Sequence, residues 1–218
     1  MKTVQELIEL AKQYNIDGDG TEYEVLYEAS EKSFAVPGLV CEIGLRRGFG
    51  TFLMMNVVGN HKHYIAVDPF GDIPYKDGGG EMIWDYSNLM KAQTMQSIYK
   101  WCEDNSFDLY FYPLEDTEFF ARFADGVPVY DTSKGIETEY SLVHIDGPHT
   151  MELVMNETKF FVSRMAKGGY IVYDDIVQYD HGPIDSYLLS NGFVRDIVGR
   201  THKVGYKKHE NIIHSSRL

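Results

Sequence analysis

The sequence predicts an α/β protein built on a mostly parallel β-sheet. Short apolar runs that fit buried strands alternate with longer segments whose apolar residues recur at helical spacing. Seven strands are expected, at residues 38–44, 64–67, 109–112, 142–145, 170–173, 192–198 and 203–207. Strands that alternate with helices run parallel, because each helix carries the chain back to the same end of the sheet. The last two strands are joined by a short turn and should form an antiparallel hairpin at the sheet edge.

The stretch 142–175 shows this alternation most clearly. An apolar strand ends at Asp146, and apolar residues then recur at helical spacing after Thr150, the expected N-cap of a helix. We expect Gly168-Gly169 to end that helix. A second apolar strand follows and ends at Asp174-Asp175. The stretch is therefore predicted to form a βαβ unit with two parallel strands.

Two helices are expected before the first strand. Thr3 and Glu6 fit a capping box that begins the first helix, and the second covers about residues 22–32. We expect residues 1–36 to form a helical cap or a dimer contact, and residues 37–218 to form the main domain. No helix or strand is predicted for two polar stretches, which lie at residues 71–86 and 124–140.

Composition and charge argue against several classes of function. The 218 residues carry a net charge of −13, and a chain that binds nucleic acid or an anionic membrane needs a surplus of Lys and Arg. No apolar run approaches the length of a membrane span, and the N-terminus lacks a signal-peptide pattern. The two cysteines, Cys41 and Cys102, are too few for a disulfide framework. We therefore expect reduced thiols in a cytoplasmic protein.

A glycine-rich turn follows the first strand. It has the spacing E-x-G-x-x-x-G-x-G, formed by Glu42, Gly44, Gly48 and Gly50. This spacing differs from the G-x-G-x-x-G of a dinucleotide site, and the wider turn has room for an amino-acid-like group. Asp68 ends the second strand about 20 residues later, where a carboxylate accepts hydrogen bonds from ribose hydroxyls. Together these features predict a site for a nucleoside joined to an amino-acid group.

Three acids follow the fourth and fifth strands. Asp146 ends the fourth, and Asp174 and Asp175 end the fifth. The carboxyl ends of parallel strands lie at one edge of the sheet, which is also where ligands bind in such folds. Three carboxylates at one edge repel one another unless a positive charge lies between them. The sequence therefore predicts a cation at this edge.

These features resemble the class I S-adenosylmethionine (SAM) methyltransferases. Five βα-type strands followed by a reversed hairpin describe that Rossmann-like sandwich with its mostly parallel seven-stranded sheet. The glycine turn looks like the first motif of the family, which holds the methionine part of SAM, and the resemblance spans about residues 38–207. It implies that SAM is bound by Glu42, Gly44, Gly48, Gly50, Asp68, Pro69, Phe70, Leu114, Glu115 and Asp146.

Three segments are similar to the metal-dependent O-methyltransferases, a branch that includes the catechol, caffeoyl-CoA and macrocin-type enzymes. They are Asp68-Pro-Phe-Gly-Asp-Ile-Pro, Asp146-Gly-Pro-His149 and Gly168-Gly-Tyr-Ile-Val-Tyr-Asp174-Asp175. The similarity implies Mg²⁺ bound by Asp146, Asp174 and Asp175. It implies that His149, beside Asp146, acts as the general base on a small hydroxylated acceptor, such as a sugar or a secondary metabolite. Homodimers are common among such enzymes.

Several residues and two other functions stay open on the sequence alone. Arg46 and Arg47 could contact a carboxylate or face solvent, and solvent is favoured. His144 is expected to be a packed core residue, and His181 a loop residue. A SAM methyltransferase that uses no metal would keep the same acids without an ion. A non-catalytic binding or assembly protein would pair Asp146 or Asp175 with an arginine.

Overall fold

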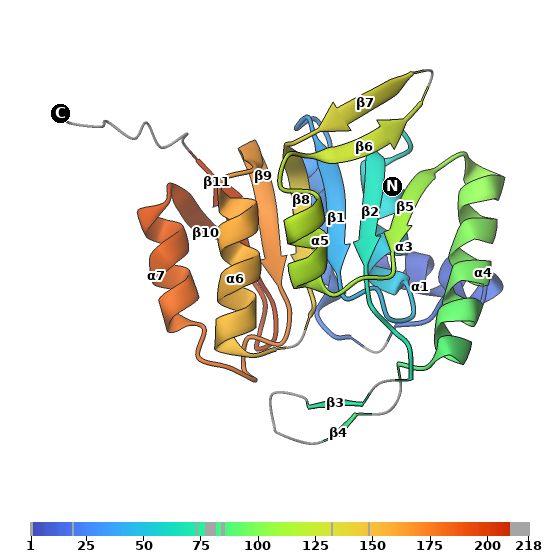
Figure 1. The fold of residues 1–218 in the computed structure, drawn as a ribbon, viewed down its shortest axis with the longest axis horizontal. Helices are drawn as coiled ribbons and strands as arrows, with labels where there is room; N and C mark the ends of the chain where they lie inside the picture. The colour runs from blue at the N-terminus through green and yellow to red at the C-terminus, as the bar shows by residue number, and fades with distance from the viewer. Residues whose placement is uncertain are drawn as a thin grey trace.

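A mostly parallel seven-stranded sheet forms the centre of the molecule and confirms the predicted fold class (Figure 1). The structure is a computed structural model that describes residues 2–18, 20–72, 74–76, 82–83, 86–131, 133–147 and 149–209. The strand order is β10-β11-β9-β8-β1-β2-β5. The bounds are β1 Leu39–Ile43, β2 His63–Val67, β5 Asp108–Tyr112, β8 Tyr140–Ile145, β9 Met165–Tyr173, β10 Phe193–Val198 and β11 Val204–Lys208. Only the pairs that involve β11 are antiparallel, so the predicted C-terminal hairpin is present.

Seven helices cover the two faces of the sheet in the described part of the chain. Their bounds are α1 Val4–Gln13, α2 Tyr23–Ser33, α3 Phe49–Val58, α4 Asn88–Asn105, α5 Asp116–Arg122, α6 Met151–Val162 and α7 Gly182–Ser190. One buried cluster joins α1 to α4 with one sheet face, and a second joins α5 to α7 with the other. Figure 1 shows α5 and α6 in front of the sheet and α1 and α3 behind it. The sheet is therefore shielded on both faces, as parallel strands require.

The N-terminal helices begin where the sequence predicts and share the core of the main domain. The capping box of α1 is formed, because Thr3 Oγ1 accepts from Glu6 N and Glu6 Oε2 accepts from Thr3 N at 2.7 Å. Leu7 of α1 and Leu26 of α2 are buried in the same cluster as Phe52 of α3. The chain boundary predicted at residue 37 therefore separates two segments that pack against each other.

The predicted role of Gly168-Gly169 is wrong, because these glycines lie inside a strand. Helix α6 ends at Val162, and β9 already begins at Met165, whose backbone pairs with Tyr140. The register between β8 and β9 shifts beside the glycines. A Cβ on Gly169 would lie 2.8 Å from the carbonyl oxygen of Ser141. The two glycines thus permit a bulge with close backbone approach, which a local helix pattern cannot distinguish from a helix stop.

Two short hairpins occupy the polar stretches for which no strand was predicted. In 124–140, β6 Val127–Tyr130 pairs antiparallel with β7 Lys134–Glu137, and Val127 and Val129 are buried in the core. A proline in β6 and its short length hid this strand in the sequence. In 71–86, β3 Tyr75–Lys76 pairs with β4 Met82–Ile83, and most of the rest of that loop lies outside the described residues.

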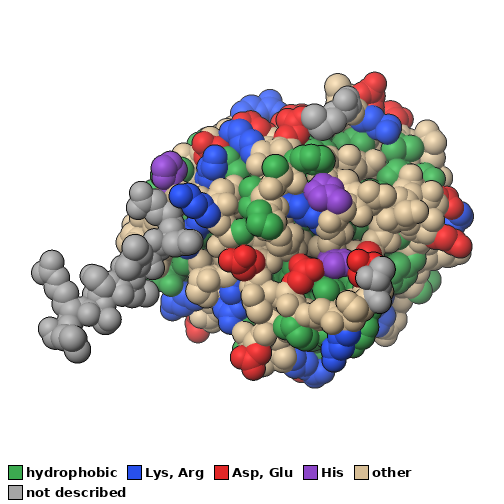
Figure 2. Space-filling model, turned by 90° about the horizontal axis from the view of Figure 1, so that it is seen from above, with side chains coloured by type: hydrophobic (Ala, Val, Ile, Leu, Met, Phe, Trp, Pro, Cys, Tyr) green, Lys and Arg blue, Asp and Glu red, His purple; other side chains and the backbone are tan. Residues whose placement is uncertain are grey.

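Charged side chains of both signs lie on the surface. On the face that Figure 2 shows, acidic and basic side chains are interspersed among the described residues. Both cysteines are buried free thiols. Within the described part of the chain, none of the helices has the length and apolar character needed to cross a membrane.

Replacement of Phe161 by alanine should destabilise the protein strongly. Its side chain is fully buried, and its ring lies 5.1 Å from that of Tyr140, centroid to centroid. We expect Phe161→Ala to lower the free energy of unfolding by about 3–5 kcal/mol, because the lost packing leaves a cavity. Chemical denaturation measures this, with Phe34→Ala as the control, since Phe34 is 53% exposed. Equal losses in both variants would contradict the assignment of Phe161 to the core.

Candidate functional site

The predicted site residues gather at the carboxyl ends of the strands, around two cavities. One, of about 370 Å³, has a polar lining that includes the glycine turn after β1 and the acids after β8 and β9. The other, of about 290 Å³, is lined by the ends of β1 and β2, the start of α5 and the loop after β8. Gly44, Tyr86 and Asp146 line both cavities. A ligand with one polar and one apolar half could therefore occupy both.

The glycine turn is built for close backbone contact. Gly44 has a φ of +89°, and a Cβ there would lie 2.0 Å from the carbonyl oxygen of Asp146. Gly48 has a φ of +88° and is the N-cap of α3. Glu42, in β1, links the strand to the start of α3, since its Oε2 accepts from Thr51 N at 2.8 Å and from Thr51 Oγ1 at 2.5 Å. The turn thus leaves its backbone open toward the polar cavity, as a site for an amino-acid group requires.

Asp68 links the glycine turn to the end of β2. Its Oδ2 accepts from Arg46 N at 2.8 Å and its Oδ1 accepts from Phe70 N at 3.1 Å. Burial raises the pKa of this carboxyl to about 6. Each oxygen has a second lone pair that can accept from a ribose hydroxyl. The other residues predicted on the nucleoside side also line the smaller cavity, and they are Pro69, Phe70, Leu114 and Glu115.

A buried carboxyl pair behind the smaller cavity was not predicted. Glu157 on α6 is fully buried, and neither of its oxygens has a hydrogen-bond donor among the described residues. It interacts electrostatically with Asp116, which lines the smaller cavity. Burial, and then the Asp116 charge, raise the pKa of Glu157 well above its ordinary value. Glu157 therefore holds its proton more tightly than a free carboxyl does, an effect that no local sequence pattern signals.

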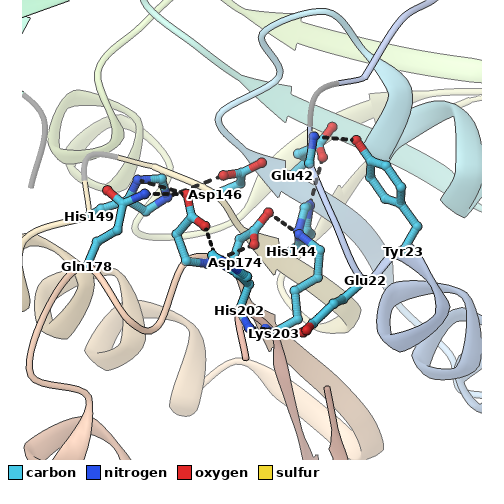
Figure 3. Close-up of polar contacts among 12 residues, drawn as sticks. Glu22, Tyr23, Glu42, His144, Asp146, His149, Asp174, Gln178, His202 and Lys203 are labelled. Carbon is cyan, nitrogen blue, oxygen red and sulfur yellow. Dashed lines mark hydrogen bonds and ion pairs between the residues drawn. The ribbon is translucent and has the colours of Figure 1, made fainter. Parts of the chain in front are cut away.

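His149 lies between two of the predicted acids in the polar cavity (Figure 3). Its Nε2 is 3.3 Å from Asp146 Oδ1, and its Nδ1 is 3.8 Å from Asp175 Oδ2. Burial opposes its charge, but the carboxylates, Asp146 foremost, outweigh this and raise the pKa of the imidazole. The predicted base is thus beside its predicted partner. It takes up a proton more readily than a free histidine.

Strained backbone marks the same edge of the sheet. Non-glycine residues with positive φ are uncommon and gather at functional sites. Four of them follow strand ends around the cavities, and they are Arg46 (44°), Phe70 (49°), His149 (27°) and Asp175 (47°). Their φ angles could not be predicted from composition or periodicity.

His144 is buried as expected, but it lines the polar cavity instead of packing only in the core. Its Nδ1 is 2.8 Å from Glu42 Oε1, while its buried Nε2 has no hydrogen-bond partner among the described residues. Figure 3 shows the ring between Glu42 and the aspartates. Period-two alternation along β8 could have revealed this, because His144 and Asp146 share a face of the strand.

The side chains after β9 do not fit the predicted magnesium site. Asp174 Oδ2 accepts from Lys203 Nζ, and its Oδ1 accepts from Asp175 N at 2.7 Å. Asp175 contacts Gln178 Nε2 at 2.6 Å and His202 Nδ1 at 3.0 Å. Mg²⁺ needs several oxygens in near-octahedral geometry. Two of the predicted ligands, Asp146 and Asp174, belong to a described metal-capable group that His144 completes, and its ligand atoms lie within 4.8 Å of one another.

The remaining charged residues differ in exposure. Arg47 is exposed, as favoured, and lies 3.5 Å from Asp17. Arg46 is partly buried and lines the polar cavity, with its guanidinium carbon 5.6 Å from the ring centre of Tyr86. His181 lies outside both cavities and contacts Tyr206 Oη at 3.0 Å. No arginine contact of Asp146 or Asp175 is present among the described ion pairs, so the pairing expected of a non-catalytic protein is not seen there.

Comparisons with known proteins identify the type of domain. Residues 41–176 match the profile of a family described as "Methyltransferase domain", which is more than half of the chain. No match is found among curated proteins. Solved structures with the same fold include an O-methyltransferase from Bacillus cereus in complex with SAH. Its TM-score is 0.56 at 10% identity, and the alignment covers 94% of this chain and 90% of that one.

Two further solved structures share the fold and differ in what their names say. A ribosomal protein methylase from Lactobacillus delbrueckii subsp. bulgaricus has a TM-score of 0.56 at 14% identity, covering 89% of this chain and 81% of that one. A calicheamicin methyltransferase has a TM-score of 0.55 at 14% identity, covering 96% and 95%. One name refers to a protein substrate and the other to a small molecule. At these identities the likeness shows the fold alone.

Replacement of Asp68 by asparagine should weaken cofactor binding. The asparagine side chain has only one acceptor oxygen, so it cannot accept from both Arg46 N and Phe70 N. The ribose would therefore lose an oriented acceptor. We expect Asp68→Asn to weaken binding of S-adenosylhomocysteine by about 10–100-fold, the size of one or two charge-assisted hydrogen bonds. Calorimetry measures this, with Asp108→Asn at the other end of the sheet as the control. Unchanged affinity in Asp68→Asn would exclude the ribose assignment.

Glu157 should make stability depend on pH. Its folded-state pKa is raised, so the folded protein keeps a proton that the unfolded chain loses above about pH 4.5. The stability of the wild type should therefore fall, by up to about 1.4 kcal/mol per pH unit, as the pH rises from 5 toward the folded-state pKa. Glu157→Gln removes this dependence, whereas Glu152→Gln, exposed on the same helix, keeps it. Urea denaturation at pH 5 and 8 compares the three, and parallel pH profiles would disprove the raised pKa of Glu157.

Proposed function

The chain belongs to the methyltransferase domain family, and from this membership we propose that it transfers the methyl group of SAM to a hydroxyl oxygen of a small molecule. It is a SAM-dependent methyltransferase; the oxygen acceptor is the proposed part. The observation that carries the proposal is His149, held between Asp146 and Asp175 beside the glycine turn. Oxygen acceptors need a base at the point where the methyl group is transferred.

Under this proposal the two cavities hold the two halves of SAM. The methionine part would lie over the turn between Gly44 and Gly50 in the polar cavity. The ribose would donate to Asp68, and the adenine would lie in the smaller cavity beside Leu114 and Glu115. Since Gly44 and Asp146 line both cavities, the sulfonium would lie near Asp146. Two carboxylates close to this position favour the cationic donor over its neutral product.

The acceptor hydroxyl would be deprotonated by His149. Methyl transfer is an in-line displacement, so the oxygen must lie close to the methyl carbon with its lone pair free. His149 would take the proton on the ring nitrogen that faces the acceptor. The carboxylates that raise the pKa of its imidazole also stabilise the imidazolium formed in this step. Asp146 thus orients the base and offsets its charge.

The lining of the polar cavity supports a small, hydroxylated and uncharged acceptor. Several carboxylates and amide groups surround the space next to His149, including Asp175 and Gln178. These groups accept hydrogen bonds from hydroxyls or donate hydrogen bonds to them, and the carboxylates repel anions. A sugar or a hydroxylated secondary metabolite fits this chemistry better than a phosphorylated molecule does. Neither a nucleic acid nor a membrane is proposed as a partner, given the net charge of −13.

Two candidates differ in what supplies the positive charge beside the three aspartates. A magnesium-dependent enzyme would bind the ion with Asp146, Asp174 and Asp175, and Lys203 would then have to leave Asp174. A metal-independent methyltransferase is the second candidate, and the contact between Lys203 and Asp174 favours it. Thermal stabilisation by S-adenosylhomocysteine, with and without Mg²⁺, separates the two. A shift that grows with Mg²⁺ supports the first, and a shift that ignores Mg²⁺ supports the second.

The proposed chemistry is tested by the loss of the base. His149→Ala should lower turnover by about 10²–10⁴-fold, because the acceptor would stay protonated, and should leave the affinity for S-adenosylhomocysteine nearly unchanged. Turnover is measured as methyl transfer from labelled SAM to a panel of phenols, catechols and sugars. His61→Ala is the control, because His61 is exposed and contacts only Phe34 O among the hydrogen-bond partners described. Full activity of His149→Ala would rule out His149 as the base.

A further inference from the structure

Lys203 is a buried cation at the acidic edge of the sheet. It lies one residue before β11 and is 1% exposed, and Asp174 is 5% exposed. Its Nζ donates to Asp174 Oδ2, and it lies 5.6 Å from the ring centre of Tyr23. In Figure 3 the lysine reaches toward Asp174 from below, on the side away from His149. The Asp174 carboxylate compensates the charge of the buried ammonium, so the two residues depend on each other.

The backbone of Lys203 is fixed as firmly as its side chain. Glu22, just before α2, accepts from Thr201 N at 2.7 Å and from His202 N and Lys203 N at 3.0 Å each. A Cβ on Gly199 would lie 2.2 Å from Glu22 Oε2, so the turn approaches this carboxylate closely. Strand β11 pairs with β9 so that Val204 faces Tyr173. This register places Lys203 opposite Asp174, and the fixed backbone keeps the ammonium within reach of that carboxylate.

A divalent ion at Asp174 would compete directly with this ammonium. One Asp174 oxygen is bound to Lys203 and the other to Asp175 N. The oxygens of Asp175 contact Gln178 and His202. A doubly charged ion beside a fixed ammonium would add repulsion in a poorly solvated place, where charges interact more strongly than in water.

We propose that Lys203 supplies, as a permanent part of the chain, the positive charge that the predicted Mg²⁺ would supply, so that methyl transfer proceeds without a divalent ion. The catalytic part of this inference rests on the proposed function. The part that concerns metal binding does not depend on it. Lys203 balances the charge of Asp174. Asp146 and Asp175 are then left to hold His149. Lys203 is a positioning residue, because it acts on the acceptor side only through Asp174.

Metal binding can be tested without any acceptor. We expect the EDTA-treated wild type to bind neither Mn²⁺, followed by electron paramagnetic resonance, nor Mg²⁺, followed by calorimetry, more tightly than on the order of 1 mM. Lys203→Met removes the ammonium at similar volume and frees Asp174. Its affinity for Mn²⁺ should be higher by on the order of tenfold or more, which is the effect of removing one competing charge. Lys32→Met is the matched control, because Lys32 also pairs with an aspartate, Asp196, but at the surface.

Each outcome decides the inference. Stoichiometric Mn²⁺ binding by the wild type that Asp174→Asn abolishes would overturn it, as would a folded Lys203→Met variant with no gain in Mn²⁺ affinity. If Lys203→Met does not fold, the wild-type titration alone decides. Turnover of the wild type should be unchanged by EDTA. If no acceptor in the panel is methylated, the proposed function fails while the metal titrations still stand.

Discussion

The concentration of carboxylates at the ends of β8 and β9 is the constraint on which the rest of the site depends. Two such charges about 4 Å apart repel by about 4 kcal/mol at the effective dielectric constant of a protein surface. The chain relieves this repulsion with its own side chains. Lys203 pairs with Asp174, and His149 lies between Asp146 and Asp175. The ammonium thus offsets the Asp174 charge at all times, whereas His149 offsets the charges of its two neighbours when it takes up a proton.

The strand order explains why the two cavities meet at Asp146. Strand β8 lies between β1, which leads into the glycine turn, and β9, which Asp174 follows. The loop after β8 therefore borders both the turn and the acidic edge. Gly44 approaches the backbone of Asp146 so closely that no side chain fits, while the Asp146 carboxylate contacts His149. Asp146 thus borders both cavities.

The sequence predicted what local patterns can encode. The capping box at Thr3 and the strand that ends at Asp68 follow from spacing and residue type within a short window, and both are present. Gly168-Gly169 was misassigned because a bulge and a helix stop use the same residue. Lys203 and Glu157 escaped prediction because their roles depend on partners distant in the sequence, Asp174 and Asp116. A buried lysine looks like a surface lysine until the strand register is known.

The contact between Glu22 and the turn before β11 changes the meaning of the N-terminal helices. These helices were predicted as a cap or a dimer contact, roles that concern packing alone. Glu22 instead orients three successive amides of the turn that carries His202 and Lys203, and Tyr23 lines the polar cavity. Loss of this segment would free the turn and leave Asp174 without a fixed cation, even if the sheet stayed intact. The segment before β1 is therefore part of the electrostatic construction of the site, and a substitution at Glu22 should act on the acidic edge through Lys203.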